Sequence, residues 1–333
     1  MVRWIPFFAV GLCLMANAHA GKKNKKNKAA SEPQVVEIEQ GTAELTENTD
    51  GTGDLIRLPC DWAEGAVFTY DYRSEKHSPD SETPVVMTYG LALTVKKSGD
   101  PQTIRYLGGE PEVSGPEELI APLKAAVEGL PPMPLDVVLF GGAVTGLGNF
   151  EELAPSLEIM TQRMFGDDGS PASVHAQAMF ANAETASPLL LVEPQSFFTG
   201  HCVNMREGQR VVADVNMPSP LGGVVKGTST VWLEALDTEA GTVTYRSDDV
   251  TDPESTASLV RQLISQMVPE GAEQAAIEQA LAMLPPIDNR INMTMVMSLT
   301  DGFPISMRIE QTVGMEGHAG HRTEIKSWTR VAQ

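Results

Sequence analysis

Residues 291–313 read INMTMVMSLTDGFPISMRIEQTV, and this stretch decides the fold. Two runs of alternating apolar and polar residues, 291–299 and 303–313, flank the pair Asp301-Gly302. Alternation with a period of two predicts β-strands, and an Asp-Gly pair between such runs predicts a tight hairpin turn. The sequence therefore predicts an antiparallel hairpin, and a further strand over 323–331 extends it into a meander.

Similar runs occur on both sides of the chain's midpoint. The longest covers 85–95 (VVMTYGLALTV), where every second residue is apolar. Shorter strand-like runs cover 67–73, 103–107, 135–140, 209–217, 225–235 and 242–247. Segment 189–192 is expected to be a short apolar strand or a buried segment. Antiparallel β-structure is thus expected to dominate the ordered part of the chain.

Helical patterns lie between these runs. One helix is expected over 116–128, and Asp252 with Pro253 predicts the start of another. A further helix is expected over 272–283. Asn149 with Glu152 predicts a capping box at the start of a helical middle segment, in which a second helix begins near Pro171.

The two parts of the chain repeat one order of elements. Each begins with a cysteine and a Glu-Gly pair, at Cys60 and Glu64-Gly65 and at Cys202 and Glu207-Gly208. Each then runs through three strands, a helix and a Leu-Pro-Pro stop to another strand. We expect an α+β fold of two related halves of curved antiparallel sheet with helices packed on one face. The halves cover 56–148 and 201–333, a helical insertion covers 149–200, and they form either one continuous sheet or two half-barrels.

The N-terminus predicts export. Arg3 precedes an apolar run over 4–15 that is too short to span a bilayer, and Ala18-His19-Ala20 offers small residues at a cleavage site. We expect a signal peptide over 1–20, cleavage near Ala20, and a periplasmic or extracellular protein with no transmembrane segment in the mature chain. Residues 21–55 are expected to be a disordered linker, basic first and acidic later.

The charge of the chain excludes nucleic acid as a partner. Of the 24 basic residues, Arg3 and five lysines lie before residue 31, which leaves 18 against 44 acidic residues in the remainder. Such an acidic body repels polyanions. The same surface could instead meet a basic envelope protein.

Two cysteines remain after cleavage, because Cys13 leaves with the signal peptide. In an oxidising compartment, a pair of cysteines predicts a disulfide. We expect Cys60 and Cys202 to bond and to fasten the two halves together. The alternative is two separate buried thiols.

No catalytic motif is complete in this sequence. The glycine-rich segment 142–148 has Glu151 where a dinucleotide fingerprint needs its third glycine, and we expect a hairpin turn before a helix cap. His77, His175 and His201 lie far apart with no local nucleophile partner. We therefore expect a protein that is not an enzyme and holds no cofactor.

One face of the predicted sheet is rich in methionine and could hold an apolar ligand. Its candidate lining residues are Met87, Tyr89, Leu91, Leu93, Met293, Met295, Met297 and Met307. The alternative is that helices fill this face completely, which makes it an ordinary core. A less favoured alternative is a Cu(I) site of Met295, His318 and His321, since thioether and imidazole groups suit that ion.

The strand order and the turn Asp301-Gly302-Phe303-Pro304-Ile305 resemble lipoprotein-carrier proteins of the LolA type and uncharacterised bacterial envelope proteins. The resemblance covers 288–331 and 66–107 and includes no ligand motif. It implies a curved sheet with helices across its concave side, and binding of a lipid, a lipoprotein or another apolar small molecule. A structural or interaction module with fully packed faces is the alternative function.

Overall fold

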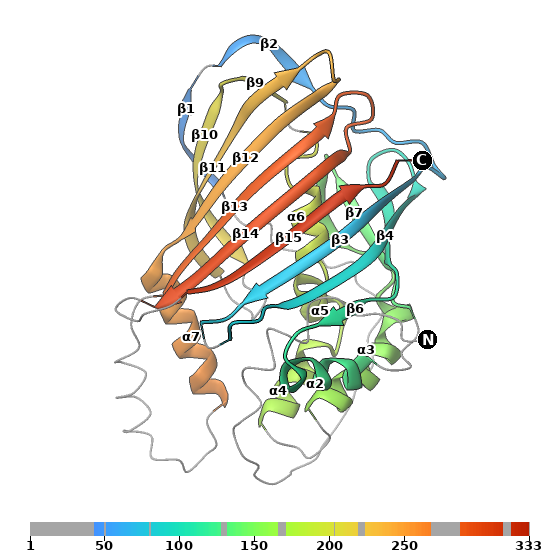
Figure 1. Ribbon diagram of the computed structural model, residues 1–333, viewed down its shortest axis with the longest axis vertical. Coiled ribbons are helices and arrows are strands. Elements are labelled where there is room, and N and C mark those ends of the chain that lie inside the picture. Colours follow the sequence, from blue (N-terminus) through green and yellow to red (C-terminus); the bar gives the residue numbers. More distant parts are fainter. Residues whose placement is uncertain are drawn as a thin grey trace.

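A continuous, curved antiparallel sheet forms the body of the protein (Figure 1). The computed structural model describes residues 43–49, 51–79, 81–127, 132–165, 171–202, 204–218, 224–267, 287–315 and 321–332. Within them, the main sheet has 13 strands, of which twelve follow the order β1-β10-β11-β12-β13-β14-β15-β3-β4-β5-β7-β8 and the thirteenth, β6, pairs with β4. Strands β2 and β9 form a second, two-stranded sheet. The fold is α+β, in agreement with the sequence pattern.

The strands alternate with helices along the chain. The strands are β1 (Ala43–Thr49), β2 (Thr52–Arg57), β3 (Val67–His77), β4 (Val85–Lys97), β5 (Gln102–Gly108), β6 (Glu112–Ser114), β7 (Leu135–Phe140), β8 (Ala143–Leu147), β9 (Asn204–Glu207), β10 (Arg210–Pro218), β11 (Val224–Asp237), β12 (Thr242–Thr251), β13 (Ile287–Ser298), β14 (Pro304–Met315) and β15 (His321–Arg330). The helices are α2 (Glu117–Val127), α3 (Phe150–Phe165), α4 (Pro171–Met179), α5 (Ala183–Leu190), α6 (Val192–Phe198) and α7 (Pro253–Met267).

The last strand closes the sheet onto the first long strand. β15 pairs with β3 in antiparallel register from Thr323 opposite His77 to Arg330 opposite Tyr70. The sheet is therefore continuous, which excludes two separate half-barrels. In Figure 1, α6 lies inside the curve of the sheet, and the other helices gather at one end. None of the helices in the described part of the chain is long and apolar enough to cross a membrane.

One prediction about local structure is wrong, and another is confirmed only in its second alternative. The linker expected over 21–55 contains β1 and the beginning of β2, and β1 pairs with β10. Polar residues form β1 because an edge strand needs backbone hydrogen bonds more than an apolar face. Segment 189–192 is not a strand, but the alternative of a buried segment is confirmed, because Leu189, Leu190 and Leu191 are buried where α5 ends and α6 begins. The expected signal peptide, residues 21–42 of the linker and the helix expected over 272–283 lie outside the described residues.

The Asp301-Gly302 hairpin is confirmed between β13 and β14. Gly302 has φ +70°, and the Phe303 amide donates to Asp301 Oδ1 at 3.0 Å. The turn packs against the segment before β3, because Trp62 Nε1 donates to the Asp301 carbonyl at 2.7 Å. A Cβ atom added at Gly302 would lie 2.1 Å from the Pro59 carbonyl oxygen.

Gly302→Ala is therefore expected to lower the free energy of unfolding by more than about 2 kcal/mol. About 1 kcal/mol comes from the left-handed backbone and the rest from the clash with Pro59. Gly241→Ala is the matched control, since Gly241 has φ +66° but open space around it. Urea unfolding of both variants measures the difference, and equal losses would contradict the packing argument.

The disulfide between Cys60 and Cys202 is confirmed, with the two Cα atoms 5.4 Å apart. It lies beside the β2–β9 ladder, in which Arg57 is opposite Asn204. The bond thus joins the segment before β3 to the segment that follows α6. The β7–β8 turn packs on it, since a Cβ atom at Gly142 would lie 2.6 Å from Cys202 Sγ. The glycine-rich segment 142–148 forms this hairpin turn and strand β8.

Candidate functional site

The inner face of the sheet, on which α6 packs, changes from apolar to polar along the strands. Three rows of side chains run across neighbouring strands, as the pairing registers define them. The apolar row consists of Leu233, Tyr245, Met295, Met307, Trp328, Tyr72 and Tyr89. The middle row consists of Val231, Ser247, Met293, Ile309, Lys326, Ser74 and Met87. The polar row consists of Ser229, Asp249, Ile291, Gln311, Glu324, Lys76 and, at its end on β4, Val85.

Burial follows the same gradient. Every member of the apolar row is buried, and Met295 and Trp328 are inaccessible to solvent. In contrast, all members of the polar row are only partly buried. Helix α6 covers the apolar end, where the ring of Phe197 lies 5.1 Å from that of Tyr70 and 6.3 Å from that of Trp328. Solvent therefore reaches the inner face from the polar end.

A buried carboxyl group anchors α6 to the sheet. Glu193 Oε1 accepts hydrogen bonds from the hydroxyl groups of Tyr89, at 2.8 Å, and Tyr106. Burial raises the pKa of Glu193, although both tyrosines and Lys326 oppose the shift. Glu193 Oε2 has no hydrogen-bond partner within the described residues. The carboxyl group thus has one atom free to accept a proton or to receive a hydrogen bond.

Charged side chains meet at the β15–β3 junction, between the middle and polar rows. Glu324 Oε1 lies 3.4 Å from Lys76 Nζ and 3.6 Å from Lys326 Nζ, and Ser74 Oγ donates to it at 3.4 Å. Burial lowers the pKa of Lys76 to about 8, although Glu324 opposes the shift. Burial also disfavours ionised Glu324, but Lys326 and Lys76 outweigh it and lower the pKa of Glu324.

The opposite end of the polar row is acidic. Ser229 Oγ donates to Asp249 Oδ1 at 2.5 Å, across the β11–β12 pair. Burial raises the pKa of Asp249, and the nearby Asp248 adds to the shift. The polar row therefore has the pair Lys76 and Glu324 at its β3 and β15 end, with Lys326 beside them in the middle row, and an aspartate with a raised pKa on β12.

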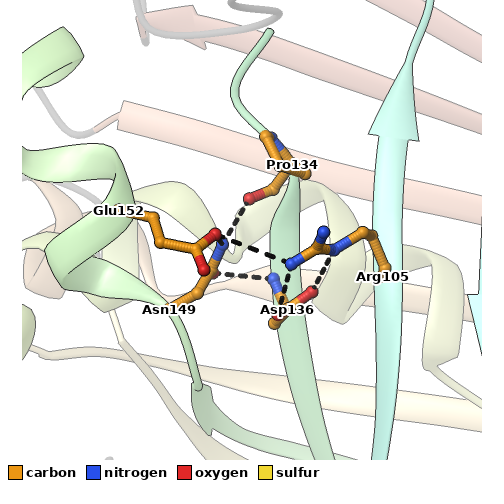
Figure 2. Close-up of polar contacts among 5 residues, drawn as sticks. All are labelled: Arg105, Pro134, Asp136, Asn149 and Glu152. Carbon is orange, nitrogen blue, oxygen red and sulfur yellow. Dashed lines mark hydrogen bonds and ion pairs between the residues drawn. The ribbon is translucent and has the colours of Figure 1, made fainter. Parts of the chain in front are cut away.

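A second polar cluster lies where α3 meets β5 and β7 (Figure 2). Arg105 forms a two-pronged ion pair with Asp136, with N–O distances of 2.6 and 2.8 Å. Asn149 precedes α3 as predicted, but its side chain does not form the expected capping box. Its Oδ1 accepts from the Asp136 amide, and its Nδ2 donates to the Pro134 carbonyl and to Glu152. The cluster fixes the start of α3 to β7, which is a structural role.

The predicted apolar lining residues lie together on the inner face. Tyr89, Met295 and Met307 belong to the apolar row, and Met293 and Met87 belong to the middle row. Leu91, Leu93 and Met297 lie deeper in the same core. Seven of the eight are buried, and Met87 is partly buried.

The structure does not bring the alternative copper ligands Met295 and His321 together. Met295 is opposite Met307, whereas His321 is opposite Gly314, seven residues further along β14. This separation is about 24 Å at the usual rise of a strand. Met295 is also fully buried and His321 is exposed. His318 lies outside the described residues, and no group of three His, Cys, Asp or Glu side chains within them could hold a metal ion.

The sequence reasoning missed the charged residues of the inner face. Glu324, Lys326 and Trp328 alternate on β15, so the pattern placed all three on one face. Glu193 gave no signal, because its partners Tyr89 and Tyr106 are distant in sequence. No protein-family model and no curated protein matches this chain.

Proposed function

We propose that this protein binds an amphiphile, such as a lipid or a lipidated segment, on the inner face of the sheet. The gradient from the apolar row to the polar row carries the proposal. An acyl chain would contact Met293, Val231 and Ile291, while the polar group would stay near the solvent-accessible polar row. Burial of each methylene contributes about 0.8 kcal/mol, so a long chain supplies enough free energy for binding.

We propose further that the protein is exported and binds its ligand outside the cytoplasm. The apolar run at 4–15 and the small residues before Gly21 support a cleaved signal peptide. The Cys60–Cys202 bond supports an oxidising compartment. The resemblance to lipoprotein carriers supports both the location and the class of ligand, as an analogy of fold.

We also propose that the two arms of the sheet arose from a duplication. The arms β3-β4-β5-β6-α2-β7 and β10-β11-β12-α7-β13 share the order of three strands, a helix and a strand, and the first arm has the short strand β6 in addition. Gly65 and Gly208 both have positive φ, and their amides donate to Val95 on β4 and to Leu233 on β11, respectively. Equivalent hydrogen bonds at the start of each arm support related halves better than a chance likeness.

A second candidate function is that of an interaction module without a ligand. The packing of Phe197 against Tyr70 and Trp328 favours it, because α6 already covers the apolar row. Under this alternative, the acidic surface would meet a basic partner. Ligand binding separates the two candidates.

We expect the mature protein to bind a fluorescent fatty acid. The Ile291→Glu variant should bind it about tenfold or more weakly. Ile291 is half-buried in the polar row, and a carboxylate there opposes an acyl chain. Val250→Glu is the matched control, because Val250 is exposed on neighbouring β12 and does not share the inner face. Fluorescence titration measures both.

The wild-type protein and the two variants separate the outcomes. If the wild-type protein binds no fatty acid, lysolipid or monoacylglycerol, the proposed function is wrong. If Ile291→Glu and Val250→Glu bind like the wild type, the ligand lies elsewhere. Near-UV circular dichroism of Ile291→Glu verifies that its fold is intact.

A further inference from the structure

The cluster at the β15–β3 junction carries an excess of positive charge. Lys76 and Lys326 share the carboxylate of Glu324, and Arg322 on the same strand raises the positive potential at both Lys76 and Glu324. These four residues carry three positive charges and one negative charge. Counting Glu193 as ionised still leaves an excess of one, in a chain whose formal net charge is −20.

Burial makes this excess of positive charge energetically unfavourable. The side chains of Lys76 and Lys326 are only 13% and 11% exposed. Ammonium groups removed from water are destabilised unless an anion compensates them. The lowered pKa of Lys76, near 8, has burial as its largest cause and the neighbouring cations Lys326 and Arg322 as further ones. An anion beside Lys76 and Lys326 would relieve this repulsion.

The cluster also lies where the inner face changes character. Lys326 is in the middle row, next to Ile309 on β14, and Lys76 is in the polar row. Two residues further along β15, Trp328 belongs to the apolar row. An amphiphile with its chain against the apolar side would thus place its first polar group beside the lysines.

We propose that Lys76 and Lys326, assisted by Arg322, bind the anionic head group of the amphiphile, a phosphate or a carboxylate. This inference rests on the proposed function and specifies its ligand. Ammonium and guanidinium groups form strong charge-assisted hydrogen bonds with such oxygen anions. Ser74, which already donates to Glu324, lies opposite Lys326 and two residues before Lys76 on β3, and it could donate to the same anion. A cationic head group is disfavoured by the same charges.

The test compares three probes of the mature protein by isothermal titration calorimetry at low salt. Dodecyl phosphate carries the chain and the anion, monododecanoylglycerol carries a chain without charge, and inorganic phosphate carries the anion alone. We expect dodecyl phosphate to bind at least about tenfold more tightly than the other two. High salt should reduce this preference, although less than for an exposed charge pair.

Substitutions test whether Lys76 and Lys326 cause the preference for dodecyl phosphate. Lys76→Met and Lys326→Met are expected to bind dodecyl phosphate about tenfold more weakly while binding of monododecanoylglycerol is retained. Lys96→Met is the matched control, since Lys96 is exposed on β4 and should leave all three affinities unchanged. Lys326→Arg keeps the charge and should retain most of the preference, which separates charge from a packing role.

The outcomes distinguish this inference from the function on which it rests. If both dodecyl probes bind the wild type equally, the head-group inference is wrong and amphiphile binding stands. If neither dodecyl probe binds, the proposed function itself is wrong. If inorganic phosphate binds as tightly as dodecyl phosphate, the cluster is a site for small anions and the head-group inference is overturned.

Discussion

Replacing Cys60 and Cys202 together by serine is expected to lower the free energy of unfolding by about 5 kcal/mol. The bond closes a loop with a sequence separation of 142 residues. In the chain-entropy model, a loop of this length restricts the unfolded state by about this amount at 25 °C. Urea unfolding of the oxidised protein and of the double variant measures the difference.

The native surroundings of the bond lead us to expect a loss near this value. Cys202 follows α6 and His201, and the β7–β8 turn packs on its sulfur atom. Gln102 Nε2 donates to the Cys60 carbonyl at 2.7 Å, which fixes the other end. The hydrogen bond from Gln102 goes to the main chain of Cys60 and does not depend on sulfur, and serine is close to cysteine in size, so the change acts mainly on the unfolded chain.

A reducing agent provides the control for this experiment. Dithiothreitol should destabilise the wild-type protein by a similar amount and should have no effect on the double variant. A loss below about 1 kcal/mol would show that the unfolded chain is already held compact by other interactions.

Local patterns predicted the elements of this fold well. The turn at Asp301-Gly302 was predictable because only a few residue pairs suit a tight hairpin. The cap at Asp252 was predictable because its side chain accepts the Ser255 amide, here at 2.6 Å. The pairing of Cys60 with Cys202 was predictable because only these two cysteines remain if the signal peptide, with Cys13, is removed and the compartment is oxidising.

Long-range arrangement was less predictable. The alternation in 323–331 predicts a strand but does not specify that it pairs with β3, which makes the sheet continuous. The β1 strand was missed, because its polar sequence AELTENT forms a strand only where β10 offers a free edge.

The polar part of the candidate site was missed for a different reason. Charged residues such as Lys76 and Glu324 are normally assigned to the solvent side of a strand. Their place on the inner face follows from their register with Tyr72 and with Trp328, whose ring contacts Phe197 of α6. Sequence patterns report which residues share a face, but not how far a covering helix extends over that face.

Acid is expected to destabilise the protein through one buried side chain, His201. Burial lowers the pKa of His201 to about 3, although the nearby main chain of Phe198 opposes the shift. Its ring is surrounded by aromatic rings with centroids 5.1–5.8 Å away, those of Trp62, Phe197, Phe198 and Phe303. The neutral form is therefore the one that the folded state accommodates.

The sign of the effect follows from the two pKa values. Above pH 6.5, His201 is neutral in both states and contributes no pH dependence. Between pH 6.5 and about 3, the unfolded chain binds a proton that the folded protein does not. The free energy of unfolding consequently falls by about 1.4 kcal/mol for each pH unit of acidification in this window.

Other groups change stability with pH, so a variant must isolate this one. Glu193 and Asp249 have raised pKa values in the folded protein. Above the pKa values of the unfolded chain, these two groups therefore lower the free energy of unfolding as the pH rises, which is the opposite of the effect of His201. His201→Phe removes the titrating group and keeps an aromatic ring in the cluster. The difference in unfolding free energy between wild type and His201→Phe should change by about 1.4 kcal/mol per pH unit between pH 6 and 4 and stay constant above pH 7.

His77→Phe is the control, since His77 lies exposed at the end of β3. The unfolding free energy of His77→Phe should depend on pH in nearly the same way as that of the wild type, whereas that of His201→Phe should not. Parallel curves for wild type and His201→Phe would mean that His201 takes up its proton while the protein is folded. Water would then reach the aromatic cluster around His201. In that case α6, Trp62 and the Asp301-Gly302 turn would not exclude water from this end of the inner face.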